Sequence, residues 1–225
     1  MPLNAAATFL QVGDEFALMT EPSHVAYSTQ AGDTNVAGFL TANNQNMTCD
    51  FVNASCAAPS PPHQQAARFL LHTANQYTSA KHLRAAEVSK DQAGKLGALR
   101  SAAGMEQKQN KNMMKSQTGH TAVFGQTVQL LSTASAQFVR MEKLVAAEDD
   151  TALRCSLASD AKRSKLMHFK ILPAFATRNE GTNIRMGDTV ILEAMRDGLQ
   201  MHCEFSNAEV GDTREANVAV SGTPL

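Results

Sequence analysis

Histidine, acidic and basic clusters are the features of this sequence that could support a metal site or catalysis. The best candidate pair of metal ligands is His72 and His82, but the surrounding patterns place one on a strand and the other on a helix. The acidic run EDD at 148–150 lacks the alternating oxygen ligands of a calcium loop. The basic run AKRSK at 161–165 could hold a phosphate, but it lies where a connection between strands is expected.

Recognised catalytic motifs are also absent from the sequence. It contains no G-x-S-x-G motif, no phosphate-binding loop and no H-E-x-x-H helix. We therefore predict no enzyme activity, no catalytic residue, no cofactor and no metal site.

Basic side chains are concentrated between residues 78 and 117. The basic residues of this segment are Lys81, Arg84, Lys90, Lys95, Arg100, Lys108, Lys111 and Lys115, and the acidic ones are Glu87, Asp91 and Glu106. Such an excess of positive charge complements an acidic neighbouring surface, although a lysine-rich helix exposed to solvent is the simpler alternative. We predict that an interface with a neighbouring domain or subunit includes Lys81, Arg84, Lys108 and Lys111.

The same segment has the composition of helices. Ala, Lys, Gln, Met and Leu dominate, no proline occurs, and the pattern is broken near Gly94 and Gly97. This predicts two helices, at about 78–91 and about 98–115, joined by a bend as an αα-hairpin. We call this hairpin the arm.

A short motif that occurs three times predicts an internal repeat. QVGDEFALMT at 11–20, VFGQTVQLLS at 123–132 and RMGDTVILEA at 185–194 share a glycine, a polar residue and evenly spaced apolar residues. On a strand such residues share one face, and the glycine permits a turn that a side chain resists. The repeat glycines Gly13, Gly125 and Gly187 are 112 and 62 residues apart. The arm explains most of the longer interval, and the Asn/Ser/Pro-rich segment 43–62, which we predict to be disordered, explains the rest.

Short alternating runs outside the arm predict strands. They lie at 24–29, 38–42, 68–72, 137–141, 152–157, 168–172, 199–203 and 217–221. Three units of about four strands fit a β-trefoil best, because equivalent units close on themselves and leave few exposed edges. We predict an all-β fold with a helical insertion: a single β-trefoil domain over 1–225 that carries the arm at about 78–117.

The third unit lacks room for its last strand. Phe169 lies 44 residues after Gly125, and the same offset from Gly187 falls beyond Leu225. The closing strand is therefore either absent or displaced into ANVAVSGTPL at 216–225. This predicts that the sequence is a piece of a longer chain.

Composition excludes several classes of partner. The chain is 43% hydrophobic with a formal net charge of -1, which does not favour nucleic acid or an anionic membrane. No apolar run approaches the roughly 20 residues needed to cross a bilayer, and the N-terminus lacks the features of a secretory signal. The four cysteines form no C-x-x-C motif and are predicted to be reduced, partly buried thiols. We expect a cytosolic domain that does not insert into a membrane.

Several motifs resemble, in their order, the N-terminal domain of inositol trisphosphate receptors, which is related to that of ryanodine receptors. FLQVGDEFAL at 9–18 resembles the family's FLHIGD start. PPHQQAARFLLHTANQYTSAKHLRAA at 61–86 is similar to its Pro-Pro, Phe strand and Asn-x-Tyr entry to the arm, and MEQKQNKNMMKSQTG at 105–119 resembles the end of that arm. HFKILPAFATRNEGTNIRMGDTVIL at 168–192 continues the match. The Lys-Gln-Asn run favours the inositol trisphosphate branch.

The resemblance implies a β-trefoil that serves as the regulatory (suppressor) domain of a tetrameric calcium-release channel, at the cytosolic face of the endoplasmic reticulum membrane. Its partners would be the adjoining inositol trisphosphate-binding core, whose affinity it lowers, and neighbouring subunits. In the family the basic residues that hold inositol phosphate lie in the domains that follow this one. A stand-alone β-trefoil that binds protein or carbohydrate is the alternative, although the absence of Trp counts against a sugar site.

The loop after the predicted strand 168–172 departs from the family pattern. His168 stands where a Trp is common, and Phe175 and Ala176 stand where the family often has Tyr followed by Lys, a pair linked to signal transmission. Pro173 should end the strand, which leaves Phe175 as an aromatic anchor for a partner on a polar loop. We predict an interaction loop that includes Phe175, Ala176 and Arg178. The alternative is that Phe175 plugs one end of the barrel.

Overall fold

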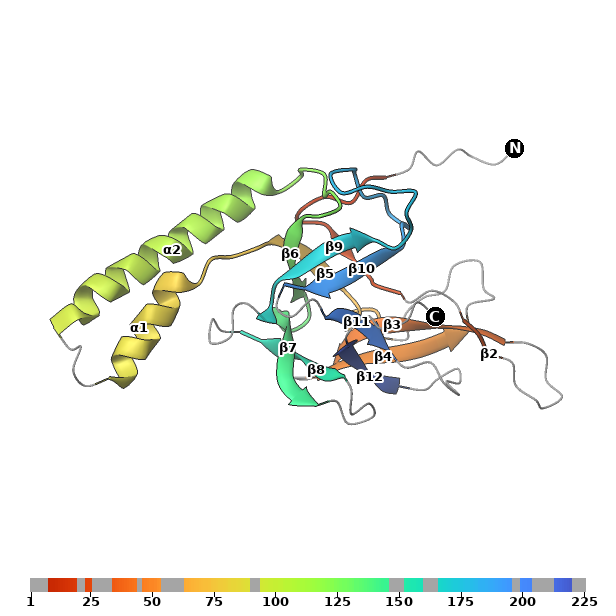
Figure 1. The fold of residues 1–225 in the computed structure, drawn as a ribbon, viewed down its shortest axis with the longest axis horizontal. Helices are drawn as coiled ribbons and strands as arrows, with labels where there is room; N and C mark the ends of the chain where they lie inside the picture. Colours follow the sequence, from red (N-terminus) through yellow and green to blue (C-terminus); the bar gives the residue numbers. More distant parts are fainter. Residues whose placement is uncertain are drawn as a thin grey trace.

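The structure is a computed structural model, and it describes most of the chain. The described residues are 8–19, 23–25, 34–43, 46–53, 63–89, 94–145, 152–159, 166–195, 199–203 and 213–219. The EDD and AKRSK runs lie outside these ranges. The described part consists of a body of β-strands and two helices that project from it side by side (Figure 1). The prediction of an all-β fold with a helical insertion is confirmed.

The strands fall into three units that follow the repeat. The first unit holds β1 (Glu15–Phe16), β2 (Ser23–Val25), β3 (Thr34–Asn43), β4 (Asn46–Asn53) and β5 (Phe69–Thr73). The second holds β6 (Thr127–Ser132), β7 (Gln137–Val145), β8 (Leu153–Ala158) and β9 (Phe169–Pro173). The third holds β10 (Val190–Ala194), β11 (Gln200–Cys203) and β12 (Thr213–Ala219). The helices α1 (Thr78–Val88) and α2 (Leu96–Gln117) lie between the first and second units.

Three backbone hydrogen bonds join the starts of the units in a closed ring. The N–H of Ala122 donates to the carbonyl of Leu10 at 2.8 Å, and the N–H of Ile184 donates to the carbonyl of Ala122 at 2.9 Å. The N–H of Leu10 closes the ring by donating to the carbonyl of Ile184 at 2.9 Å. These residues are 112 and 62 positions apart, as the repeat glycines are. The equivalence confirms the internal repeat.

The repeated turn has the same conformation in each unit. Gly13, Gly125 and Gly187 have φ angles of 93°, 88° and 89°, a region that glycine adopts without strain. The polar residue after each glycine accepts the N–H of the residue three positions before it. The donor–acceptor pairs are Gln11 to Asp14 at 2.8 Å, Val123 to Gln126 at 3.2 Å and Arg185 to Asp188 at 2.9 Å.

The strands pair with a threefold pattern. Strands β1 and β5, β5 and β6, β6 and β9, and β9 and β10 are antiparallel neighbours. Strands β3 and β4, β7 and β8, and β11 and β12 form three hairpins, and β2 pairs with β3 at the edge of the first hairpin. Each hairpin also contributes one strand to contacts between the hairpins. These three strands, β4, β8 and β12, pair with one another. This arrangement is the one that a β-trefoil requires, and the closed barrel of a β-trefoil stays a prediction.

The core lies where the three units meet. Alternate residues of β5 and β9 are buried, with Phe69 and Leu71 in one strand and Phe169 and Ile171 in the other. The hairpins contribute further apolar side chains, including two free thiols that are buried, Cys49 and Cys155. The prediction of reduced, buried cysteines is therefore confirmed for these two.

One prediction about strands is wrong, and one of two alternatives for the closing strand is excluded over the described residues. Segment 43–62 was expected to be disordered, but its residues 46–53 form β4 because Met47, Cys49 and Phe51 alternate on a buried face. Residues 54–62 lie outside the described ranges. The closing strand is not displaced into 216–219, since these residues end β12 and pair with β11 and β8 in the third hairpin. Residues 220–225 are not described.

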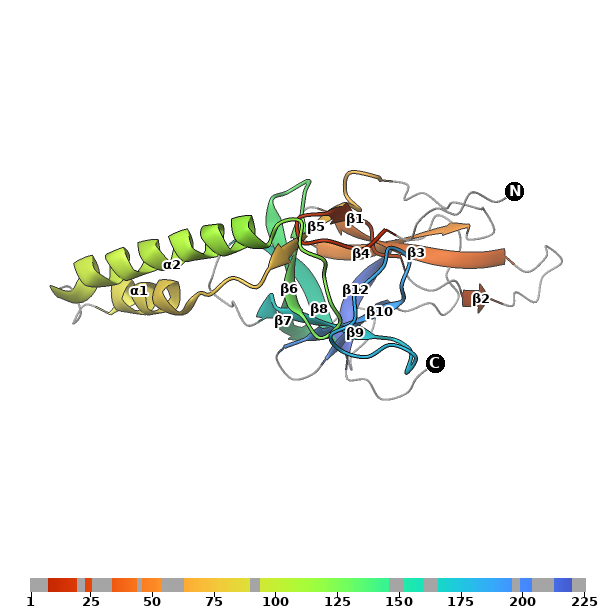
Figure 2. The same cartoon turned by 90° about the horizontal axis from the view of Figure 1, so that it is seen from above.

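The arm is attached to the body through one face of α2. Figure 2 shows both helices extending away from the body in a second view. Glu106, Asn110 and Met114 follow each other at intervals of four residues and so share one side of the helix. Glu106 is buried, and its carboxylate accepts the backbone N–H groups of Ser79 and Ala80 at 2.8 and 3.1 Å.

Glu106 takes the place of an N-cap for α1. Tyr77 occupies the N-cap position and makes no side-chain capping hydrogen bond, although the first N–H groups of a helix need acceptors. A carboxylate is favoured there because the N-terminal end of a helix carries partial positive charge. The start of α1 is thus stabilised by a residue of α2, and the two helices depend on each other.

The segment that leads into the arm is held by side-chain amides. The Asn110 side chain accepts the N–H of Gln76 at 2.9 Å and donates to the carbonyl of Gln76 at 2.7 Å. The side-chain oxygen of Gln129, a fully buried residue of β6, accepts the N–H of Asn75 at 2.9 Å. Its nitrogen donates to the hydroxyl of Tyr77 at 3.1 Å. These contacts of residues 75–77 form what we call the arm root, and they fix the arm to the body.

Replacement of Glu106 should loosen the arm. We expect Glu106→Ala to lower the free energy of unfolding by about 2–3 kcal/mol and Glu106→Gln by about 1–2 kcal/mol, because buried N–H groups lose charged acceptors. Urea unfolding followed by circular dichroism measures the change. The exposed ion pair of Glu87 with Arg100 provides the control, since Glu87→Gln should cost less than about 1 kcal/mol. Equal losses in Glu106→Ala and Glu87→Gln would contradict the capping role.

Candidate functional site

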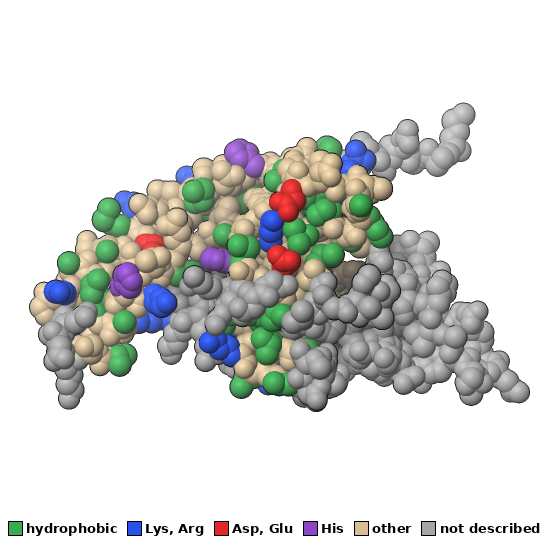
Figure 3. All heavy atoms as spheres, in the orientation of Figure 1, with side chains coloured by type: hydrophobic (Ala, Val, Ile, Leu, Met, Phe, Trp, Pro, Cys, Tyr) green, Lys and Arg blue, Asp and Glu red, His purple; other side chains and the backbone are tan. Residues whose placement is uncertain are grey.

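The outer face of α2 presents the basic side chains of the arm to solvent. Lys108, Lys111 and Lys115 are exposed and follow each other at intervals of three and four residues, so they form a stripe along the helix. Lys81 is exposed on α1, whereas Arg84 is partly buried. Figure 3 shows basic side chains along the arm between hydrophobic ones. Of the four residues predicted to form an interface, the three lysines are therefore the exposed ones.

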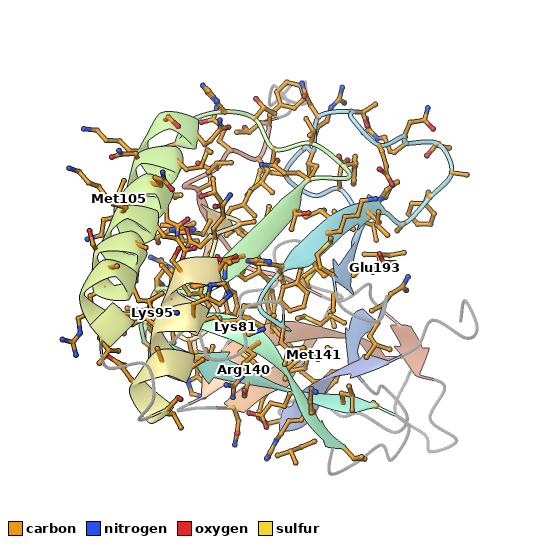
Figure 4. All side chains as sticks on the ribbon, turned by 60° about the vertical axis from the view of Figure 1, so that its left-hand side comes forward. Lys81, Lys95, Met105, Arg140, Met141 and Glu193 are labelled. Atoms are coloured by element: carbon orange, nitrogen blue, oxygen red, sulfur yellow. The ribbon has the colours of Figure 1, made fainter. Side chains whose placement is uncertain are left out.

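Exposed apolar side chains accompany this basic surface. Met105 and Met113 of α2 are 63% and 53% exposed, and Val88 at the end of α1 is 88% exposed. In Figure 4, Met105 lies on the side of α2 turned away from the body, and Lys81 and Lys95 lie on the arm. Methionine side chains beside lysines can contribute apolar contact at a surface whose charge attracts an acidic partner.

The acidic residues of the arm do not neutralise this surface. Glu87 forms an ion pair with Arg100 at 3.7 Å, and Glu106 is buried under α1, where its charge faces the N–H groups of that helix. Asp91 lies outside the described residues. Within the described part of the chain, no ion pair involves Lys108 or Lys111, so their charges are available to a partner.

The predicted interaction loop leaves the sheet as expected. Strand β9 ends at Pro173, and Phe175 is 56% exposed, so the alternative in which it plugs the barrel is wrong. Ala176 is also exposed. Arg178 is partly buried, and its guanidinium binds the carboxylate of Asp188 at 3.2 Å. Because Asp188 also holds the glycine turn of the third unit, the loop is tied to the body next to β10.

A ring contact connects the arm root with β9. His168 lies directly before β9, and its ring stacks on Tyr77 with centroids 6.1 Å apart and planes inclined by 28°. Tyr77 in turn contacts Gln129, so strand β6, the arm root and the start of β9 meet at one place. The interaction loop begins after the last residue of β9. A short path of packed residues therefore joins the arm to the loop of Phe175.

Burial lowers the pKa values of His168 and His72. Desolvation lowers the pKa of His168 below its ordinary value of 6.5, although a hydrogen bond with the backbone of Asn75 acts in the opposite direction. Desolvation also lowers the pKa of His72, which is hydrogen-bonded to the backbone carbonyl of Thr73 and packs edge-on against Phe138. His72 thus has structural partners, and the described residues contain no group of three potential metal ligands.

The sequence of this domain matches the model of a known protein family. The family model described as inositol 1,4,5-trisphosphate/ryanodine receptor matches residues 5–223. The chain belongs to this family. Membership in a family of receptor channels, rather than of enzymes, makes residues 1–225 a domain of a calcium-release channel. Among the helices in the described ranges, none is both long and apolar enough to traverse a bilayer.

The polar residues that position the arm of this receptor domain were not anticipated from the sequence. In the sequence, Glu106 appears only as one of three acidic residues among the basic ones of the arm, and nothing local assigns a role to Asn110 or Gln129. Glu106, Asn110 and Met114 recur at intervals of four residues in a lysine-rich helix. This spacing is the signal in the sequence for the side of α2 that faces α1 and the body. Gln129 gives a weaker signal, as a polar residue between two apolar ones in β6.

Truncation of Phe175 should hardly affect stability. Because the side chain is exposed, Phe175→Ala should lower the free energy of unfolding by less than about 1 kcal/mol. Phe169→Ala in β9 is the matched control, and it should cost about 3–5 kcal/mol because that ring is fully buried. Thermal or urea unfolding of both variants measures the difference. A loss at Phe175 as large as at Phe169 would show that the ring packs into the body.

Acid should destabilise the domain partly through His168. Below about pH 6.5 the unfolded chain takes up a proton on this residue, whereas burial keeps the folded state neutral to lower pH because it lowers the pKa. The free energy of unfolding therefore falls as the pH decreases from about 6.5 toward the pKa of the folded state. His168→Phe keeps an aromatic ring next to Tyr77 and removes the proton site.

The measurement compares melting temperatures at about pH 7.5 and about pH 5.5. We expect the His168→Phe variant to lose less stability on acidification than the unaltered domain. His72 remains in both proteins, so the difference isolates His168. An equal loss in the two proteins would contradict this contribution.

Proposed function

We propose that this domain is the regulatory (suppressor) domain of an inositol trisphosphate-gated calcium-release channel at the cytosolic face of the endoplasmic reticulum membrane. In this role it lowers the affinity of the adjoining inositol trisphosphate-binding core and passes the binding signal toward the pore of a tetrameric channel. The family match over residues 5–223 is the observation that carries the proposal. The Lys-Gln-Asn run in α2 favours the inositol trisphosphate branch over the ryanodine branch.

The construction of the arm supports a role in contact with a neighbouring domain or subunit. The arm is anchored by the buried Glu106 and by Asn110, while its outer face carries exposed lysines and methionines. A rigid basic projection holds its charges at fixed positions and so complements an acidic surface at little cost in conformational entropy. Lys81, Lys108 and Lys111 are the residues we assign to this interface.

The exposed loop supports a second contact, for which we assign Phe175, Ala176 and Arg178. Phe175 offers an aromatic anchor, and the ion pair of Arg178 with Asp188 limits the motion of the loop. The stacking of His168 on Tyr77 connects this loop, through β9, with the arm root. A displacement of the arm by a neighbour could thus reach the loop through contiguous packed residues.

Charge reversal on the arm tests the proposal in the channel that carries this domain. We expect Lys108→Glu with Lys111→Glu to weaken the arm contact and to raise the affinity for inositol trisphosphate about fivefold or more, because suppression is relieved. Radioligand binding measures the affinity. The melting temperature of the isolated domain should change by less than roughly 2 °C, since both side chains are exposed.

Lys143→Glu is the matched control because this exposed lysine lies on β7 of the body rather than on the arm. It should leave the affinity for inositol trisphosphate unchanged. An unchanged affinity in the double variant, or an equal change in Lys143→Glu, would contradict a regulatory contact through the arm.

A further inference from the structure

The exposed charges of α2, a helix that is described over its whole length, are all positive. Its one acidic residue, Glu106, is buried against the start of α1. Its four basic residues are exposed, namely Arg100, Lys108, Lys111 and Lys115. Glu87 of α1 offsets the charge of Arg100 at 3.7 Å, which leaves the three lysines as the main source of the field. A partner with negative charge complements this surface.

A glycine interrupts the basic surface in the middle of the helix. Gly104 is exposed, and it lies four residues after Arg100 and four before Lys108, so the three share one side of α2. A side-chain carbon built at Gly104 would meet no atom of the described residues within 4 Å, apart from the backbone of the helix itself. We call the gap at Gly104 between Arg100 and Lys108 the notch.

The domain itself gives no reason for a glycine at this position. Glycine disfavours a helix because it loses more conformational freedom than other residues, and it is needed where φ is positive or where another group approaches closely. Gly13 and Gly125 meet both conditions, with φ angles of 93° and 88° and neighbouring atoms at 3.0 and 2.8 Å. Gly104 lies within a regular helix and, among the described residues, has no such neighbour. Close approach by a second molecule is the reason that fits it.

A helix is the partner that gains most from the notch. Side chains at intervals of four residues form ridges on a helix, and two helices pack by placing the ridges of one into the grooves of the other. Where a ridge lacks a side chain, a second helix can cross it with a short distance between the axes. A membrane attracts basic residues by charge alone, so a missing side chain gives it no advantage. Met105, next to the notch, is 63% exposed and points away from the body in Figure 4, where it can cover an apolar residue of the second helix.

The same face of a second copy is excluded by its charge. Two α2 helices packed through their notches would bring Lys108 and Lys111 of one copy against those of the other. Like charges held together at an interface cost free energy, so this contact is unfavourable. The partner helix must therefore be acidic.

We propose that the notch and its basic flanks dock an acidic helix of a neighbouring domain or subunit. The docked helix crosses α2 at Gly104, where it carries a small residue, and it presents Asp or Glu at intervals of three or four residues to Lys108 and Lys111. The proposal identifies the partner of the arm and in this respect rests on the proposed function. It adds the point of closest contact and the chemical class of the partner.

Maleimide labelling of a thiol placed at the notch tests the contact. In Gly104→Cys the thiol should react at least about tenfold more slowly in the assembled channel than in residues 1–225 alone, because the docked helix covers it. Gln109→Cys is the matched control, since this exposed residue lies on a different side of α2 and should react equally in both. Mass spectrometry of the peptide with the new thiol measures the labelling. Equal labelling of Gly104→Cys in the two settings would overturn the proposal.

Charge reversal and detergent test the chemistry of the partner. Lys108→Glu with Lys111→Glu, added to Gly104→Cys, should remove the protection because an acidic helix is then repelled. Protection that survives this change would overturn the proposal. The protection should persist in a detergent that keeps the channel assembled, and vesicles of phosphatidylserine should not protect residues 1–225. Protection by these vesicles, or its loss in the detergent, would show that a membrane covers the notch, which would also overturn the proposal.

A bulky residue at the notch separates docking from regulation. Gly104→Leu should raise the melting temperature of residues 1–225 by about 2–4 °C, because leucine favours a helix and the space is open. In the channel it should raise the affinity for inositol trisphosphate about threefold or more, since the partner helix no longer fits. Protection of Gly104→Cys with unchanged affinity in Gly104→Leu would support docking and contradict the regulatory function. A lower melting temperature would show that Gly104 serves the domain itself, which would overturn the proposal.

Discussion

The closed ring of hydrogen bonds through Leu10, Ala122 and Ile184 is the constraint on which the rest of the structure depends. Each of these residues uses its N–H toward one unit and its carbonyl toward the next, so the three units are fixed relative to one another at a single place. The chain between the ring positions is not constrained in the same way. An insertion between two units therefore leaves the body intact, and the arm is placed in such an interval.

The arm differs from the body in the forces that hold it. The body is stabilised by buried apolar residues, whereas the polar contacts that hold the arm come from Glu106, which caps α1, and from Asn110 and Gln129 at the arm root. Hydrogen bonds are directional and short in range, so they specify one orientation of the helices more strictly than apolar packing does. The burial of Glu106 has a second effect, because it leaves the outer face of the arm with a larger excess of positive charge.

Sequence patterns predicted the elements better than the contacts between them. The glycine turns and the strands at 38–42 and 168–172 were predictable because local periodicity and turn chemistry act over a few residues. Strand β4 was missed because its Asn and Thr residues hid the alternation of Met47, Cys49 and Phe51. Glu106 was missed for a different reason, since the N–H groups that it binds belong to residues 79 and 80, which are distant in the sequence. The exposure of Phe175 was predictable from Pro173, whereas the ion pair that holds the loop was not.

The length of α2 gives the arm the properties of a lever. The helix has 22 residues and is therefore about 33 Å long, and it joins the body at its C-terminal end. A rotation of about 10° at the arm root would move the far end by about 6 Å, which exceeds one turn of the helix. In the opposite direction, a force applied at the far end acts on the root with a long moment arm. Because the stacked rings of Tyr77 and His168 lie at the arm root, a small displacement there would be enlarged along α2 toward the outer surface of the domain.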